Sequence, residues 1–121
     1  MKIDRFEDIE TWKEARGLVN SVYAVLHDCR DFGYKDQIQR ASISVMSNIA
    51  EGFDRGTNKE FIQFLVIARG SASEVKSLAY AGMDVGHLTV ESFETIKIKS
   101  TSVSNMINGF IRYLSSSDRK R

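Results

Sequence analysis

The sequence predicts an all-α protein, an antiparallel up-down-up-down four-helix bundle, on the strength of three observations. Proline is absent and glycine occurs only eight times in 121 residues, which favours long uninterrupted helices over a β architecture with many turns. Apolar residues recur at intervals of three and four in four successive stretches. Short segments join these stretches, and short connections make sequential helices antiparallel neighbours. A single domain, residues 1–121, is therefore expected.

The first helix is expected to run from Glu7 or Asp8 to about Cys29, because apolar residues keep a helical spacing up to that point. The segment at residues 31–34 then interrupts the pattern, and Gly33 within it is free to take a positive φ. The second helix should extend from about Lys35 to Phe53.

Candidate caps delimit the other two helices. Asn58 is expected to cap a third helix, which fades between Gly82 and Gly86, and Thr89 is expected to cap a fourth. Residues 115–121, with the sequence SSSDRKR, should form a frayed basic tail beyond the last helix.

Positive charge gathers toward the end of the chain, although seventeen basic and sixteen acidic residues leave a formal net charge of only +1. From residue 97 onward, six basic residues stand against one acidic residue, Asp118. Such a surplus favours contact with phosphate groups, whereas short basic termini are commonly just solvated. The candidate nucleic-acid-binding residues are Lys97, Lys99, Arg112, Arg119, Lys120 and Arg121.

A polar stripe marks the second expected helix. At about 100° per residue, one arc carries Arg40, Ser44, Ser47, Asn48 and Glu51. Arginine offers a planar fork for phosphate, so the arc could bind a ligand. The favoured interpretation is a satisfied polar network or a subunit interface, with Glu74 as one partner. Both interpretations stay open at this stage.

Gly70 lies inside the third expected helix, where glycine is less favourable than alanine by about 1 kcal/mol. Close packing of another helix against Gly70 is the expected explanation. A catalytic role for Ser71 or Ser73 is not expected, because no histidine lies nearby in the sequence.

No enzyme activity, metal or cofactor is expected. A di-iron site of the ferritin type would need carboxylate and Glu-x-x-His ligands on facing helices, and His27 and His87 are the only histidines. Both are expected at the surface, while the lone Cys29 should be a small buried hydrophobe. Glu51 and Glu74 could hold Mg²⁺ only if the bundle brought them together.

A cytoplasmic location is expected, because the N-terminus lacks the order of charged, apolar and small residues typical of a signal peptide. No apolar run approaches the roughly 18 residues that span a bilayer, so no membrane association is expected.

Some apolar residues lie outside the core stripes, which is compatible with a subunit interface. They are Ile43, Ile62, Ile98, Met106 and Tyr113.

Two blocks, RASISVMSNIAEG at residues 40–52 and ARGSASE at residues 68–74, resemble the four-helix-bundle family first noticed as reading frames in intervening sequences of 23S rRNA genes. Accessory proteins of diversity-generating retroelements are related to that family. The opening FEDIETW, residues 6–12, is similar as well. The resemblance implies a homo-oligomeric ring, generally a pentamer. The residues that carry the motif are Arg40, Ser44, Asn48, Glu51, Gly52, Gly70, Ser71 and Glu74.

The functional hypothesis is a non-enzymatic ring that presents its basic residues to RNA, DNA or an enzyme resembling reverse transcriptase. No small-molecule substrate is expected. The alternative is a purely structural or protein-interaction module that has no nucleic-acid partner.

Overall fold

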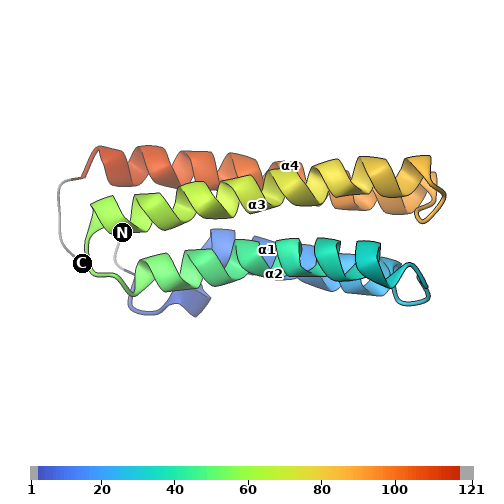
Figure 1. Cartoon of the computed structure of the whole chain (residues 1–121). Coiled ribbons are helices and arrows are strands. Elements are labelled where there is room, and N and C mark those ends of the chain that lie inside the picture. Colours follow the sequence, from blue (N-terminus) through green and yellow to red (C-terminus); the bar gives the residue numbers. More distant parts are fainter. Residues whose placement is uncertain (1–2, 118–121) are drawn as a thin grey trace.

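The computed structural model describes residues 3–117, which form one short 3₁₀ helix followed by four α-helices (Figure 1). The elements are η1 (Phe6–Asp8), α1 (Glu10–Val25), α2 (Phe32–Phe53), α3 (Asn58–Asp84) and α4 (Val90–Ser115). Residues 3–117 contain no β-strand. The all-α prediction is therefore confirmed.

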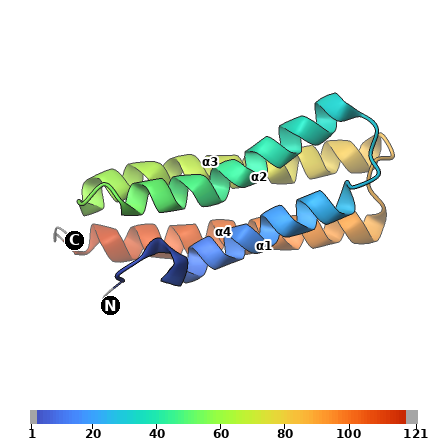
Figure 2. The ribbon, with the colours of Figure 1, turned by 90° about the horizontal axis from the view of Figure 1, so that it is seen from below.

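Each helix packs against two neighbours in the order α1, α2, α3, α4 and back to α1. The α1–α2 and α3–α4 connections lie at one end of the bundle and the α2–α3 connection lies at the other (Figure 2). This is the antiparallel four-helix bundle that the short connections predict. None of the four helices is long and apolar enough to cross a membrane, within the described part of the chain.

Two layers of apolar side chains fill the interior. The layer near the α2–α3 connection centres on Phe61, Leu65 and Val103. The layer near the other end centres on Leu18, Val75 and Ile96. Every one of these side chains is at most 1 % exposed, so the helical spacing of apolar residues corresponds directly to the core.

The first helix ends four residues earlier than its apolar spacing predicts, at Val25 rather than Cys29. Leu26 is buried and Cys29 is half-buried, and both pack against the core from the turn that follows α1. The helical spacing of apolar residues therefore extends beyond the end of α1, because this turn also contributes apolar side chains to the core. Cys29 is less enclosed than the buried hydrophobe that the sequence predicted.

The second helix begins earlier than predicted, at Phe32, and Gly33 lies within its first turn. Gly33 does not use its freedom to take a positive φ, since only Gly56 and Gly86 have positive φ among the described residues. Asp31 explains the early start: its Oδ1 accepts a hydrogen bond from the Tyr34 backbone N–H at 3.2 Å. That bond satisfies one of the donors left free at a helix start.

Threonine caps the last two helices. Thr57 Oγ1 accepts the Glu60 backbone N–H at 3.2 Å, so the predicted Asn58 cap is wrong by one residue. Asn58 is instead a buried residue of α3 that donates to the Ser117 carbonyl at 2.6 Å. The Thr89 cap is confirmed, because its Oγ1 accepts the Ser92 N–H at 3.0 Å.

The predicted tail at residues 115–121 lies only partly within the described chain. Ser115 ends α4 and Ser116 follows as its C-cap. Arg119, Lys120 and Arg121 lie outside the described residues.

Candidate functional site

The two motif blocks meet along the seam between α2 and α3. Ser44 Oγ of the first block lies 2.9 Å from Ser71 Oγ of the second. Asn48 Nδ2 donates to the Ser44 carbonyl at 2.8 Å and to Ser44 Oγ at 3.0 Å. All three side chains are half-buried. They form a small satisfied network that ties the two helices together.

The outer members of the stripe behave differently, because each pairs with a residue four positions away in the chain: Asp36 lies inside α2 like Arg40, and Arg55 lies in the turn that follows α2. Arg40 Nε lies 2.8 Å from Asp36 Oδ2, and Glu51 Oε1 lies 3.4 Å from Arg55 Nη2. These charged side chains are about half exposed or more, so each pair contributes only about 0.3–0.5 kcal/mol. The stripe is thus divided into a network at the seam and a charged outer edge.

Glu74 bonds to Gln37 Nε2 at 3.4 Å across the seam and does not pair with Arg40 or Glu51. Glu51 lies fourteen residues beyond Gln37, which is about 21 Å farther along α2. The two carboxylates considered for Mg²⁺ therefore lie at different levels of the bundle. Within the described residues, no three His, Cys, Asp or Glu side chains are grouped to hold a metal ion.

Close helix packing occurs at Gly52 and Gly82 rather than at Gly70. A Cβ at Gly52 would lie 2.6 Å from Phe64 Cβ, so α2 and α3 need a glycine there. A Cβ at Gly82 would overlap the Tyr34 hydroxyl. Gly70 is exposed, and a Cβ there would meet nothing within 4 Å. Within this chain, the prediction of close packing at Gly70 is wrong.

The structure places the predicted cations of α4 on different sides of that helix. Lys97 lies toward α3, with its Nζ 5.8 Å from the centre of the Tyr80 ring. Lys99 follows two residues later and therefore points about 160° away around the helix. Arg112 is exposed near the end of α4. The other three predicted cations lie outside the described residues.

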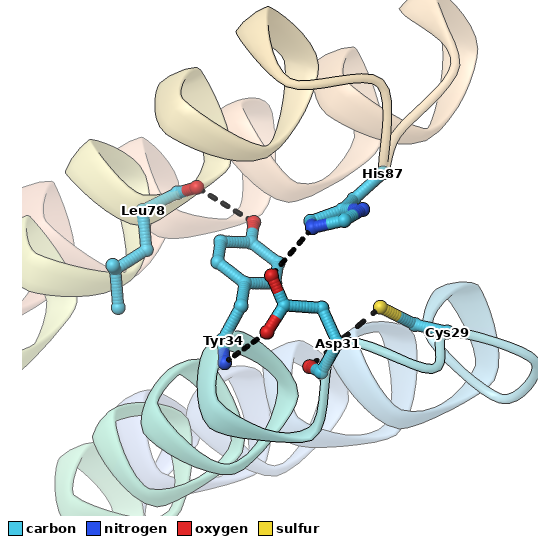
Figure 3. A network of polar contacts seen from close by, with 5 residues as sticks. All are labelled: Cys29, Asp31, Tyr34, Leu78 and His87. Atoms are coloured by element: carbon cyan, nitrogen blue, oxygen red, sulfur yellow. Dashed lines mark hydrogen bonds and ion pairs between the residues drawn. The ribbon is translucent and has the colours of Figure 1, made fainter.

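Sequence reasoning missed a polar network at the end of the bundle that carries the α1–α2 and α3–α4 connections (Figure 3). Asp31 Oδ2 lies 2.9 Å from His87 Nε2, while its Oδ1 caps α2. The Tyr34 hydroxyl donates to the Leu78 carbonyl at 2.6 Å. Cys29 Sγ lies 4.0 Å from the Asp31 carbonyl.

Of the two histidines, His27 is exposed as predicted, but the prediction of an exposed His87 is wrong: its side chain is only 24 % exposed. The α3–α4 connection folds back over α3, where the His87 N–H bonds to the Gly82 carbonyl at 2.7 Å. The imidazole then reaches Asp31, and its ring lies 5.1 Å from the Tyr34 ring. One signal was available in the sequence, since an Asp before an apolar helix is a typical N-cap.

Two pKa values in this network are shifted. The hydrogen bond from His87, followed by the Tyr34 backbone N–H, holds the pKa of Asp31 below its ordinary value of 3.8. Burial, with smaller contributions from the nearby Cys29 and Asp31, raises the pKa of Tyr34 to about 12. The network thus favours an ionised Asp31 and a neutral Tyr34.

A surface cavity of about 470 Å³ adjoins the network. Asp28 and Asp31 line it together with Arg30 and His87. Its lining contains two carboxylates and one guanidinium, so charges of both signs are present and the cavity is not suited to a ligand of one strong charge.

The fold and the polar seam define a small antiparallel four-helix-bundle protein whose second and third helices are locked by a serine contact and a close approach at Gly52. The chain belongs to the 23S rRNA-intervening sequence protein family, which matches residues 7–109. Both motif blocks lie within that match.

A solved structure from Bacteroides thetaiotaomicron, a protein with unknown function from the S23 ribosomal protein family, is similar to this chain with a TM-score of 0.73. The two share 24 % sequence identity over 84 % of this chain and 94 % of the other. That likeness supports the fold. No curated protein matches the chain.

Proposed function

We propose that the protein acts without catalysis as a homo-oligomer, a pentameric ring, that binds nucleic acid or a nucleic-acid enzyme through a basic surface. One observation carries the proposal: Lys97 and Arg112, which lie within about 60° of each other around α4, have no carboxylate within ion-pair distance in the described part of the chain. The same holds for Lys99 on the other side of the helix, which joins that surface only if the assembled ring brings the two sides together. Cations without a carboxylate partner keep their charge available for the phosphates of a ligand. A ring would multiply this charge by repetition.

Exposed apolar side chains support the oligomeric part of the proposal. Ile98 is 62 % exposed, and Ile43 and Tyr113 are each 40 % exposed. Met106 and Ile62 are half-buried, and Ile62 packs against the core. Ile98 and Ile43, two of the five apolar residues predicted to lie outside the core, could thus be buried against a second copy, and burying them would favour association.

RNA is the first ligand to test. The name of the family refers to intervening sequences of 23S rRNA, and the basic residues of α4 suit any phosphate backbone. The family name is the reason to begin with RNA, and DNA of the same sequence is titrated in parallel.

The test is a fluorescence-anisotropy titration of labelled RNA with the full chain at several salt concentrations, with light scattering to measure the oligomeric state. We expect the affinity to fall as salt rises. A variant that lacks residues 117–121 and carries Lys97→Ala and Lys99→Ala should bind more weakly. Affinity that is insensitive to salt, or that is unchanged in this variant, would exclude the electrostatic role, and a monomer would exclude the ring.

The alternative is an interaction module that assembles with itself or one protein partner. The net charge of +1 and the exposed Ile98 favour it. An oligomer that shows no affinity for RNA or DNA at low salt would establish this alternative. Nuclease activity that depends on Mg²⁺ would contradict both.

A further inference from the structure

We infer that the α3–α4 face carries a binding strip for single-stranded nucleic acid, formed by Arg69, Lys76, Lys97 and the Tyr80 ring. This inference rests on the proposed function and specifies both the surface and the kind of nucleic acid. Two of the cations, Arg69 and Lys76, were not among the candidate residues that the sequence suggested. We call these four residues the α3–α4 strip.

Contacts across the α3–α4 seam fix the position of the strip. Arg69 Nη1 donates to Asn108 Oδ1 at 2.8 Å, so Arg69 lies on the side of α3 that faces α4. Tyr80 packs edge-on against Phe93 of α4, with ring centres 4.8 Å apart. Lys97 lies over that same Tyr80 ring.

Lys76 lies between these two contacts. It follows Arg69 by seven residues, two helical turns, and so points in nearly the same direction around α3, within about 20°. The distance along the axis is about 10 Å from Arg69 to Lys76 and about 6 Å from Lys76 to Tyr80. The three cations therefore follow one line along α3 and α4, which run side by side (Figure 1).

No described carboxylate lies within ion-pair distance of the cations on this line, and the nearest along the helices, Asp84 and Glu94, lie one turn from Tyr80 and Lys97. Residues 61–83 of α3 contain one carboxylate, Glu74, and residues 95–115 of α4 contain none. Glu74 lies on the opposite seam, where it bonds to Gln37 of α2. In the described part of the chain, every ion pair involves η1, α1, α2 or the connections, and none includes Arg69, Lys76 or Lys97. Their positive charge is therefore left to a ligand of opposite sign.

The Tyr80 ring indicates whether the strip binds single-stranded or duplex nucleic acid. Its side chain is 44 % exposed, and it lies in the same row as the cations. A basic groove interleaved with an exposed aromatic ring is typical of surfaces that bind single strands, because an unpaired base can stack on the ring. The bases of a duplex are already stacked and cannot use Tyr80. The strip therefore favours single strands over duplexes.

The test compares the full chain with the triple variant Arg69→Gln, Lys76→Gln and Lys97→Gln, using a labelled single-stranded RNA across a salt series. A matched control, Lys13→Gln, Arg16→Gln and Arg30→Gln, removes the same charge from exposed positions elsewhere. For single strands, each lost phosphate contact lowers the salt slope by about 0.7, so the triple variant should lose about 2 units of slope. The control should keep the slope of the unmodified chain.

A separate variant, Tyr80→Leu, tests the stacking. We expect it to weaken binding roughly tenfold at every salt concentration while the slope stays constant. The unlabelled single strand should compete far better than a duplex of the same sequence. Circular dichroism and light scattering accompany each variant, so that a loss of folding is recognised.

The outcomes separate this inference from the proposed function. If the unmodified chain binds no nucleic acid, both fail. If it binds but the strip variant and the control have equal slopes, the strip is wrong and the proposed function stands. Equal competition by the duplex would exclude single-strand recognition, and a changed oligomeric state in a folded strip variant would show that this face is a subunit interface instead.

Discussion

Asp31 Oδ2 accepts a hydrogen bond from His87 Nε2 at 2.9 Å, across 56 positions of sequence. Asp31 also caps α2, and His87 lies in the connection between α3 and α4 (Figure 3). One carboxylate therefore joins the start of one helix to the turn between two others. We therefore expect the stability of this end of the bundle to depend on the ionisation of Asp31.

We expect Asp31→Asn to remove a contribution to stability that depends on pH. The pKa of Asp31 is lowered in the folded state, so its ionised form favours folding. The contribution is fully present above the ordinary carboxyl value of 3.8 and is lost as pH falls through the lower folded value. Asparagine remains a good N-cap, so the variant isolates the charge. Thermal unfolding of both proteins from neutral to strongly acidic pH measures the effect.

The control for this experiment is Asp28→Asn, which removes a neighbouring exposed carboxylate that does not cap α2. The difference between Asp31→Asn and the unmodified chain should shrink toward acidic pH. A difference that is constant over the whole range would mean that ionised Asp31 does not stabilise the fold.

We expect Tyr34→Phe to lower the free energy of unfolding by about 0.5–1.5 kcal/mol, because the hydrogen bond to the Leu78 carbonyl is lost. The raised pKa of Tyr34, about 12, has a separate consequence. The neutral phenol favours the fold, so this contribution is complete below pH 10 and is lost as pH rises toward 12. An ultraviolet absorbance titration should find one of the four tyrosines ionising late, and that component should be missing in the variant.

Much of this fold can be predicted from the sequence, because the apolar spacing that defines each helix also defines the core. Ile38, Val45 and Ile49 recur at helical spacing on the side of α2 opposite the polar stripe, and all three are fully buried. Helix ends were harder to predict. The hydrogen bond that Asp31 accepts at the start of α2 stabilises the helix more than Gly33 destabilises it. Gly33 lies in the first turn, whose N–H groups form no intrahelical hydrogen bonds, so its low helix preference costs little there.

The glycine that permits close packing could have been identified from its angular position around the helix, which follows from its spacing to the buried residues. Gly52 follows Val45 by seven residues and Ile49 by three, so it continues the buried side of α2. Gly70 lies two residues from both Ala68 and Ala72, which turns it to the opposite side of α3. The family motif contains both Gly52 and Gly70. Only their angular positions around the helices show that Gly52 faces the core and Gly70 faces outward. The pairing of Asp31 with His87 has no comparable local signal, because it depends on how two distant connections meet.

We expect Gly52→Ala to destabilise the protein by about 1–2 kcal/mol. Overpacking a core generally costs about 1–3 kcal/mol, and the better helix preference of alanine offsets up to about 1 kcal/mol of that. The obstacle is Phe64 Cβ, 2.6 Å away, which cannot move without its backbone. Denaturant unfolding of the variant measures the change, and an unchanged midpoint would show that α2 and α3 separate easily.

We expect Gly70→Ala to stabilise each chain by roughly 0.5–1 kcal/mol, since Gly70 is exposed within a helix and its added methyl group meets nothing. The same measurement serves as the control for Gly52→Ala. Light scattering of this variant adds a second result. Loss of the oligomer would show that the outer side of α3 is packed against another copy, where a methyl group no longer fits.

The contact between Ser44 and Ser71 should contribute to folding itself. We expect a double-mutant cycle of Ser44→Ala and Ser71→Ala to give a coupling energy of about 0.5–1.5 kcal/mol, because the two hydroxyls lie 2.9 Å apart in a half-buried seam. Ser47→Ala is the matched control, one turn along the same helix, exposed, and expected to change stability by less than about 0.5 kcal/mol. Zero coupling would mean that the seam folds equally well without this bond, and the two hydroxyls would then become candidates for contact with a ligand or a second copy.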